Sequence, residues 1–432
     1  MSYVLAFLLG FLSIVFVHEL GHFIAAKKLG IKVLEFSIFI GPKIYSFKRG
    51  ETTYTIRLIP ILAYVKLEGE EEASDSDAAY YRKPKYARIL TSAGGPLANI
   101  LLAIILLTAV FSIQGFDSAR VGSVDAKSPA AEAGIRKGDT VIRYNGKRVY
   151  TMLDVIQFLY IEKGAPATLE LMRGSGATFT AGLKPLTIPP SVSYKLGVTF
   201  KTATGSDSNL ITSISPGYPA EAAGLKPDDR IIGLDGTEIT SRDDIIKFME
   251  GGSGQELKVT VLRSGKEAGV SLKPKAEKVP EQYDMGLHFS AVKGTIFDAF
   301  RQSVIFSYSI VRSVGYSLVW LVTGKASLSQ MMGPIGMVSS IGSVVQQAPN
   351  LLDKLLNLFN MTALMSIAVG ATNLIPFPML DGNRILLVLI EAVRGKPIPL
   401  EKEAYISMVG FVLLILLAIY VGYNDIVRLV TG

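Results

Sequence analysis

Four apolar runs dominate the chain, and polar segments of mixed charge separate them. The runs cover residues 2–24, 92–113, 356–375 and 405–423. Each is close to the ~20 apolar residues that an α-helix needs to cross the hydrocarbon core of a bilayer. The pattern predicts a multi-pass α-helical membrane protein with four spans.

The first run allows two interpretations, a signal peptide or a retained transmembrane helix. It lacks a basic n-region and a small-residue cleavage site, and His18 and Glu19 interrupt its apolar stretch. Signal peptides depend on those features. We therefore predict a retained span, anchored on the cytoplasmic side by Lys27 and Lys28.

Residues 31–67 change to the pattern of β-strands. Stretches 33–40, 43–48 and 52–59 are rich in β-branched and aromatic residues, and Gly41-Pro42 forms a turn. Two interpretations stay open, a small cytoplasmic sheet or a β-hairpin that dips into the bilayer beside the first span. The second requires protein or a water-filled cavity to satisfy the backbone polar groups of the hairpin.

An internal repeat occupies the middle of the chain, since residues 131–139 recur as 221–229. Each copy predicts a short helix, a strand, a turn and a second helix. The pattern resembles the signature of the PDZ domain, except that Asp228 stands where that family usually has glycine. The resemblance implies two inserted α+β domains that capture peptides by strand addition. The alternative is that both modules only cap or gate the membrane part.

The segment 297–321 mixes apolar and aromatic residues with charges, including Arg312 in the middle of the run. A charge at that place is costly in hydrocarbon, so amphipathic interfacial helices are favoured over a fifth span. The segment 329–347, rich in Gly and Met, is predicted as a loop or a further surface helix.

Composition and charge support a membrane protein. The mean hydropathy is +0.37, and the net charge is +7. Lys and Arg concentrate between the first two apolar runs, which favours the positive-inside bias of a membrane protein over a nucleic-acid-binding patch. The positive-inside rule then makes 25–90 and 383–402 cytoplasmic. Four spans place the repeats and both termini outside the cytoplasm. The 432 residues contain no Cys, which excludes disulfides, thiolate metal sites and Cys nucleophiles.

These patterns divide the chain into consecutive segments. They are the first transmembrane helix (1–30), the hairpin region (31–67), a cytoplasmic connector (68–91), the second transmembrane helix (92–114), PDZ domain 1 (115–200), PDZ domain 2 (201–290), interfacial helices (291–350), the third transmembrane helix (351–382), and a cytoplasmic loop with the fourth transmembrane helix (383–432).

The first run also carries the strongest chemical signal, the H-E-x-x-H motif that starts at His18. Residues four apart share one helix face, so His18 and His22 can hold one metal ion. Glu19 then lies where a metal-activated water needs a base. The alternative, a pair of packed polar residues, is weak because three ionisable residues in one span need a reason. The third and last histidine, His288, lies in the region predicted to be outside.

A catalytic zinc needs a third protein ligand, and Asp381 is the candidate. It follows the prolines that break the third span, and an acid among apolar residues is a functional candidate. The alternative is that Asp381 only caps the following helix. Asn99, in the second run, is likewise either a hydrogen-bonding residue in helix packing or part of the site.

Together the motifs resemble the site-2 protease family of intramembrane zinc metalloproteases, in particular its bacterial regulators of sigma-E. The matches are H-E-L-G-H, G-P-x-x-N up to Asn99, the PDZ tandem, and N-x-x-P-x-P-x-x-L-D-G from Asn373. The resemblance implies Asp381 as third zinc ligand and Glu19 as catalytic base. It implies that Asn373 holds the substrate strand near the zinc, and it favours the membrane-dipping hairpin.

The implied substrates are transmembrane proteins, namely an anti-sigma factor and leftover signal peptides, cleaved in an envelope stress response. One departure concerns the hairpin, where the family usually has P-x-G-G-Y and residues 60–64 are Pro-Ile-Leu-Ala-Tyr. Two other classes of function stay open, a proteolytically silent PDZ-bearing scaffold and a transporter with a regulatory metal. Membrane lipid is an expected partner, and nucleic acid is not.

Overall fold

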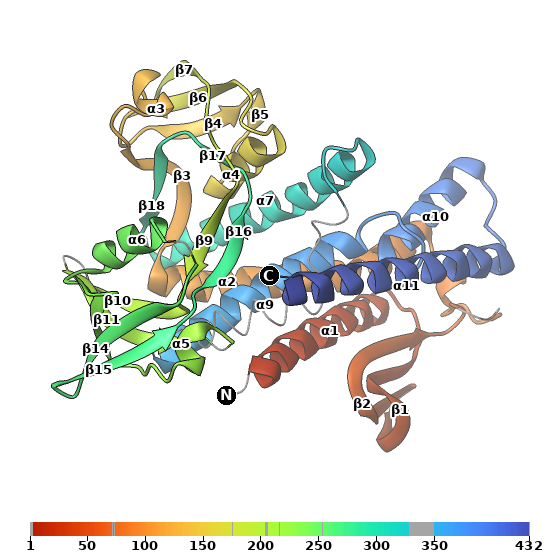
Figure 1. Ribbon diagram of the computed structural model, residues 1–432. Helices are drawn as coiled ribbons and strands as arrows, with labels where there is room; N and C mark the ends of the chain where they lie inside the picture. The colour runs from red at the N-terminus through yellow and green to blue at the C-terminus, as the bar shows by residue number, and fades with distance from the viewer. Residues whose placement is uncertain are drawn as a thin grey trace.

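The computed structural model describes residues 3–431 except 71, 73, 175, 204–205, 216, 253 and 328–349. Long helices form the centre of the molecule, and two β-rich units and one β-hairpin extend from them (Figure 1). The segment 329–347, predicted as a loop or a surface helix, lies outside the described residues.

Five helices within the described part of the chain are long and apolar enough to cross a membrane. Four of them contain the predicted spans, which agrees with a multi-pass membrane protein. The fifth, α7, covers the segment predicted to be interfacial. These helices are α1 (Tyr3–Lys28), α2 (Lys85–Gln114), α7 (Ile296–Val322), α9 (Leu351–Asn373) and α11 (Leu400–Thr431).

Helices α1 and α2 touch through their backbones. A Cβ atom on Gly21 would lie 2.3 Å from the carbonyl oxygen of Gly94, and one on Gly94 would lie 2.7 Å from that of Gly21. Both distances are too short for any side chain, and small residues are what allow helices to approach so closely. The contact holds the H-E-x-x-H segment of α1 against α2.

The hairpin strands β1 (Val33–Arg49) and β2 (Thr52–Leu67) bend so that they form a four-stranded sheet. Residues 35–38 pair with 53–56 on one side and with 63–66 on the other. The three predicted strands are confirmed. The fourth is not predicted by the pattern, because Pro60 precedes it and a proline usually marks a strand edge or end. The order of the sheet is 43–49, 52–59, 33–40, 61–67.

Two six-stranded sheets make up the β-rich units, which we call repeat 1 and repeat 2. Repeat 1 contains β3 (Phe116–Val124), α3 (Pro129–Glu132), β4 (Thr140–Tyr144), β5 (Lys147–Arg148), α4 (Met152–Ile161), β6 (Ala167–Arg173), β7 (Ala177–Leu183) and β18 (Leu287–Val292). Repeat 2 contains β10 (Val198–Ala203), β11 (Ser206–Ile214), α5 (Pro219–Ala222), β12 (Arg230–Leu234), β13 (Thr237–Glu238), α6 (Arg242–Glu250), β14 (Leu257–Arg263) and β15 (Lys266–Leu272).

The two repeats share, at equivalent positions, an ion pair between a partly exposed arginine and a buried aspartate. Arg173 donates to Asp139 over 2.7 Å, and Arg263 donates to Asp229 over 2.6 Å. The guanidinium hydrogen bonds hold the pKa of each aspartate below its usual value. The sequence repeat therefore corresponds to a structural repeat.

Strand β18 shows that repeat 2 is inserted into the sequence of repeat 1. It follows repeat 2 in the sequence but pairs with β3 at the edge of the first sheet. In repeat 2 the same edge is filled by β10, which precedes β11. Helix α2 ends directly before β3, so repeat 1 has no earlier strand to fill its edge. A domain boundary at residue 200, as predicted between the two PDZ domains, therefore separates β18 from the sheet that it completes. Two short ladders connect the repeats, β8 (Leu186–Ile188) with β17 (Gln282–Asp284) and β9 (Ser191–Lys195) with β16 (Lys275–Val279).

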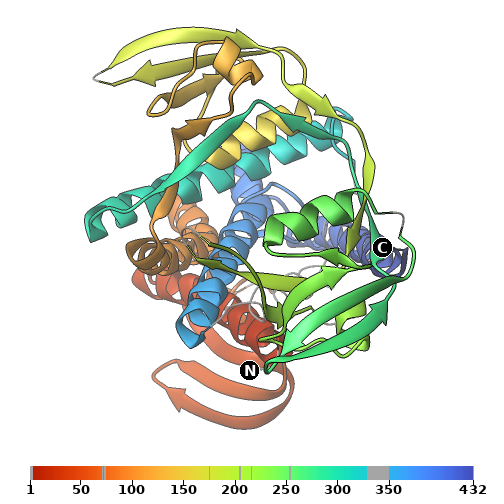
Figure 2. The ribbon, with the colours of Figure 1, turned by 60° about the vertical axis from the view of Figure 1, so that its left-hand side comes forward.

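Helix α7 packs on the helical core with one half and on repeat 1 with the other. Ser303 lies 2.9 Å from the hydroxyl of Thr108 on α2, and Arg312 pairs with the buried Asp154 of α4 over 2.7 Å. Figure 2 shows α4 lying along α7. A protein carboxylate thus neutralises Arg312, so this charge no longer argues against a span. The packing of α7 on repeat 1, which is predicted to lie outside, supports the interfacial hypothesis for 297–321, which stays a prediction.

Part of the region predicted as a cytoplasmic loop is helical, since α10 covers Asp381–Arg394. Leu387 and Val388 are buried, and Arg88 of α2 donates to Glu391 over 2.7 Å. The basic residues near this helix suggest a loop, but six consecutive apolar residues, Ile385–Ile390, form its middle. The connector before α2 contains one turn of 3-10 helix, η1 (Tyr80–Arg82).

Candidate metal centre

Three side chains from opposite ends of the sequence converge at one point. Nε2 of His18 and Nε2 of His22 lie 3.2 and 3.4 Å from Oδ2 of Asp381, and 3.2 Å from each other. Zinc bonds of ~2.05 Å in a tetrahedral site separate neighbouring ligand atoms by about 3.3 Å. The spacing and the N/O donor set therefore fit a zinc ion with three protein ligands and one open position. In the described part of the chain, no other group of His, Asp and Glu side chains converges in this way.

Helix α10 places Asp381 at the centre because the chain turns sharply after α9. Met379 has a φ of 77°, and a Cβ atom on Gly382 would lie 2.3 Å from the carbonyl oxygen of Leu374. The glycine therefore lets α10 start directly against the end of α9. Leu380 holds the N-cap position, and Asp381 is the first residue of the helix. The Asp381 carboxylate turns to the histidines, so the geometry does not favour the capping alternative.

The outer nitrogens of both histidines also have partners on α2. Nδ1 of His22 lies 2.8 Å from the carbonyl oxygen of Thr91, and Nδ1 of His18 lies 3.2 Å from the amide of Asn99. A histidine that binds metal through Nε2 carries its proton on Nδ1 and donates it. The oxygen of the fully buried Asn99 amide has no other partner, so it is the natural acceptor once the amide is turned. The side chain of Asn99 therefore lies against a ligand histidine, which favours a role in the site, and this role stays a prediction.

Replacing Asn99 by Leu is expected to weaken zinc binding by about 10- to 100-fold, because His18 loses the acceptor that orients its ring. Asn99→Asp keeps an acceptor and is expected to retain zinc. Competition with a calibrated zinc chelator measures both affinities. Equal affinity for wild type and Asn99→Leu would show that the amide does not orient the ligand.

Gly95 is the point where α2 comes closest to the ligand atoms. A Cβ atom there would lie 2.3 Å from Nε2 of His22 and 2.8 Å from Nε2 of His18. Real Cβ atoms do not approach so closely, so any other residue would displace both imidazoles. Two residues of the G-P-x-x-N motif therefore serve the site: Gly95 leaves room for both imidazoles, and Asn99 contacts the outer nitrogen of His18.

Gly95→Ala is expected to lower the zinc content well below one per protein while the helices still form. Gly422→Ala in α11 is the matched control, since a Cβ atom there meets nothing within 4 Å. Zinc analysis of the purified proteins, with circular dichroism as a check on helix content, gives the comparison. Full zinc occupancy in Gly95→Ala would mean that the two helices separate easily.

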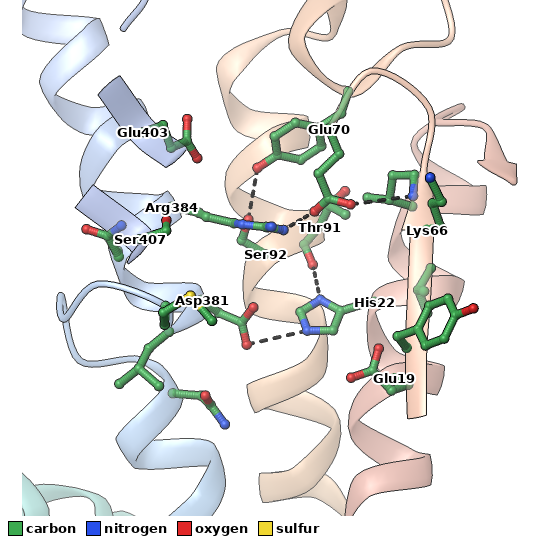
Figure 3. Close-up of a pocket in the computed structure, with 18 of the residues that line it drawn as sticks. Glu19, His22, Lys66, Glu70, Thr91, Ser92, Asp381, Arg384, Glu403 and Ser407 are labelled. Carbon is green, nitrogen blue, oxygen red and sulfur yellow. Dashed lines mark hydrogen bonds and ion pairs between the residues drawn. The ribbon is translucent and has the colours of Figure 1, made fainter. Parts of the chain in front are cut away.

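The three ligand side chains line a cavity of about 810 Å³, which we call the site cavity (Figure 3). Glu19 lies in it beside His22, and Asn373, the last residue of α9, also lines it. The amide of Asn373 donates to the carbonyl of Val369 over 3.0 Å. The structure thus brings together all five residues singled out in the sequence. His288 is elsewhere, in β18, where it pairs with Asp125.

Other polar residues of the site cavity are not indicated by any motif. Arg57 of the hairpin donates to Glu35 over 2.9 Å and to the hydroxyl of Tyr64 over 2.7 Å, and the last two line the cavity. Arg384 follows Asp381 by one helical turn and pairs with Glu70. The i, i+3 spacing from Asp381 is a signal that can identify Arg384 once Asp381 is known to lie in a site.

Comparison with known proteins gives one family. The model of peptidase family M50 matches residues 6–417. A zinc metalloprotease RasP of Geobacillus kaustophilus is 30% identical over 435 residues, covering 98% of this chain and 97% of the relative. A zinc metalloprotease RasP of Oceanobacillus iheyensis is 32% identical over 461 residues, covering 99% and 100%. The regulator of sigma-W protease RasP of Bacillus subtilis is 28% identical, covering 99% and 98%.

Two solved structures match smaller shares of the chain. The PDZ domain of HtrA3 bound to a phage-derived ligand is 16% identical and covers 21% of this chain and 91% of its own, with a TM-score of 0.19. The HtrA-type protease AlgW with a decapeptide is 15% identical and covers 27% and 51%, also with a TM-score of 0.19.

Proposed function

The chain belongs to peptidase family M50, the family of site-2 proteases, and on that premise we propose that this zinc metalloendopeptidase cleaves peptide bonds inside the transmembrane segments of single-span proteins. The observation that carries the proposal is the ligand set shared between α1 and α10, which lies in the midst of the candidate spans. The Bacillus subtilis relative is a regulator of sigma-W protease. Its name supports regulated proteolysis of an anti-sigma factor, in a stress response, as the physiological role. Leftover signal peptides are the second substrate class that we propose.

We assign His18, His22 and Asp381 as zinc ligands and Glu19 as the catalytic base. Bound zinc supplies a Lewis acid that polarises the scissile carbonyl and makes the attacking water more acidic. Glu19 accepts the proton of that water and delivers it to the nitrogen of the leaving amine. Asn99 and the Thr91 carbonyl hold the two imidazoles in orientation.

The edge of the hairpin sheet supports a docking mode for the substrate. A transmembrane helix must unwind before its carbonyl groups can be attacked, and its freed backbone groups then need partners. In the described sheet, residues 61–67 form an edge strand, and Tyr64 to Leu67 line the site cavity. An unwound segment added to this edge would lie beside Glu19, with Asn373 across the cavity. Leu62 and Ala63 stand where the family usually has two glycines, so the backbone of this edge strand is stiffer than one that follows the family pattern.

Exposed apolar side chains support the bilayer-dipping interpretation of the hairpin. Ile44, Tyr45, Leu58 and Leu62 are each about half exposed or more. Such a group is costly in water and is typical of a lipid-facing surface. We propose four spans in an inner membrane, with the repeats and both termini in the periplasm. The repeats, as PDZ domains, would admit only substrates that another protease has already shortened.

A reconstituted cleavage assay tests the proposal. The purified protein in liposomes is incubated with a single-span substrate whose N-terminus is cytoplasmic, with and without a zinc chelator. We expect fragments that disappear with the chelator and return with stoichiometric zinc. A silent scaffold or a metal-regulated transporter gives no fragments under any of these conditions. The transporter is already less favoured, because its ionisable residues would line several helices rather than one centre.

A further inference from the structure

Arg384 occupies a place in the site cavity that the proposed mechanism does not use. It lies one turn after Asp381 on α10 and reaches across the cavity above Asp381 and His22 to Glu70 (Figure 3). Its side chain is 42% exposed although it lines the cavity, so the guanidinium faces the space where a substrate would lie. A planar guanidinium can bind a carboxylate through two parallel hydrogen bonds.

The charges around Arg384 make it the preferred place for an incoming anion. The carboxylates that line the cavity outnumber the cations, and Arg57 and Tyr81 already engage two of them, Glu35 and Glu403. Besides the histidines, the cationic residues lining it are Arg384 and Lys66. A further carboxylate in this acidic space needs a cation, because an unpaired charge away from water is costly.

Peptide hydrolysis creates such an anion. Water adds across the bond, so the carbon–nitrogen bond breaks, a carbon–oxygen bond forms, and the nitrogen takes up both protons of the water. The carbonyl side becomes a carboxylate at the new C-terminus of the N-terminal fragment, and the amine side becomes an ammonium. Both charges appear inside the cavity, where neither existed in the substrate.

The position of Arg384 matches the exit of the N-terminal fragment. Glu70 and Tyr81 come from the connector, which is predicted to be cytoplasmic, and Glu403 in the first turn of α11 follows directly on the segment 383–402, which is also predicted to be cytoplasmic. In a substrate whose N-terminus is cytoplasmic, the fragment with the new carboxylate leaves through this end. We propose that Arg384 binds the newly formed C-terminal carboxylate of that fragment in exchange for Glu70, which keeps the hydrogen bond that it accepts from the Leu67 N–H. The proposal rests on the proposed proteolytic function.

A purely structural ion pair between Arg384 and Glu70 predicts a different outcome. Removing either partner would then loosen α10 from the connector, and both variants would lose stability alike. Binding of a carboxylate predicts effects of opposite sign, because Glu70 competes with the product for the guanidinium. Arg384→Gln should weaken product binding, and Glu70→Gln should strengthen it.

The test compares two N-acetylated apolar hexapeptides of the same sequence, one with a free C-terminal carboxylate and one with an amide. Their affinities are measured by calorimetry on the full protein in nanodiscs, loaded with zinc and again after chelation, which removes any carboxylate–zinc contact. We expect about a tenfold preference for the carboxylate that persists after chelation, is lost in Arg384→Gln, is retained in part in Arg384→Lys and increases in Glu70→Gln.

Three results would overturn the inference: a preference unchanged in Arg384→Gln, a preference lost in Lys66→Gln instead, or a parallel loss in Arg384→Gln and Glu70→Gln. Zinc content and melting temperature show that each variant is folded. Cleavage of a transmembrane substrate by the wild-type protein is recorded separately. A protein that cleaves but shows no dependence on Arg384 refutes this inference alone, whereas absence of cleavage refutes the proposed function.

Discussion

Replacing Glu19 by Gln is expected to abolish cleavage of a transmembrane substrate while leaving the zinc in place. The amide keeps the size of the side chain but cannot accept the proton of the attacking water. General acid–base catalysis contributes about 10²- to 10⁴-fold, so the rate should fall by at least about 10²-fold. Glu19 is not among the three converging ligand atoms, so the zinc content should stay at the wild-type level.

Initial rates with a purified substrate, together with zinc analysis, measure both parts of this expectation. Glu401→Gln, an exposed glutamate at the start of α11, is the matched control and should cleave at the wild-type rate. Full cleavage by Glu19→Gln would exclude Glu19 as the base. Loss of zinc in that variant would instead place Glu19 among the ligands.

Replacing Asp381 by Asn is expected to remove most of the zinc and, with it, all cleavage. Oδ2 of Asp381 lies within 3.4 Å of the ligand nitrogens of both His18 and His22, so the variant loses one of three protein ligands. The loss of zinc affinity should exceed the roughly 10- to 100-fold drop expected for a ligand's hydrogen-bond partner. Asp75→Asn, an exposed carboxylate in the connector, should retain zinc.

The capping alternative for Asp381 predicts another pattern. If the side chain only stabilised the start of α10, Asp381→Asn would keep its zinc and its stability, because Asn caps a helix about as well as Asp, whereas Asp381→Ala would keep its zinc and lose about 1 kcal/mol. Chelator competition and thermal unfolding of both variants separate the two alternatives. Zinc retained in both variants, with a lowered melting temperature only in Asp381→Ala, would refute the ligand assignment.

The chemistry at the centre could be predicted from the sequence because it depends on local spacing. Two histidines four residues apart share a helix face in any helix, and an acid among apolar residues is unusual wherever it occurs. Asp381 is a candidate ligand as an acid after a Pro-broken span, but its distance of about 360 residues from the motif left helix capping open, and only the family resemblance implied the ligand role. The contact itself depends on how α9 ends and α10 begins.

The residues that surround the ligands could not be identified from spacing alone. Gly95 and Asn99 act through the crossing of α1 and α2, which brings two helices into contact at Gly21 and Gly94. That crossing is set by tertiary packing and leaves no periodic signal in one sequence. The place of Arg384 in the site could not be predicted either, because a basic residue near the end of a span normally anchors the helix on the cytoplasmic side.

The fold shows the same division between local and long-range information. The strands at 33–40, 43–48 and 52–59 follow from residue type, whereas the edge strand 61–67 depends on pairing with the first of them. The sequence repeat predicts two similar units, but it does not show that β18 completes the first sheet from beyond the second. That pairing joins residues separated by more than a whole repeat.

The position of the cut in a single-span substrate tests intramembrane proteolysis most directly. Purified protein is incubated in liposomes with such a substrate, and mass spectrometry identifies the new termini. We expect both termini to lie inside the apolar segment, to require zinc and to be absent with Glu19→Gln. Cuts confined to the soluble flanks, or cleavage that persists in Glu19→Gln, would contradict a metal centre that hydrolyses peptide bonds within the membrane.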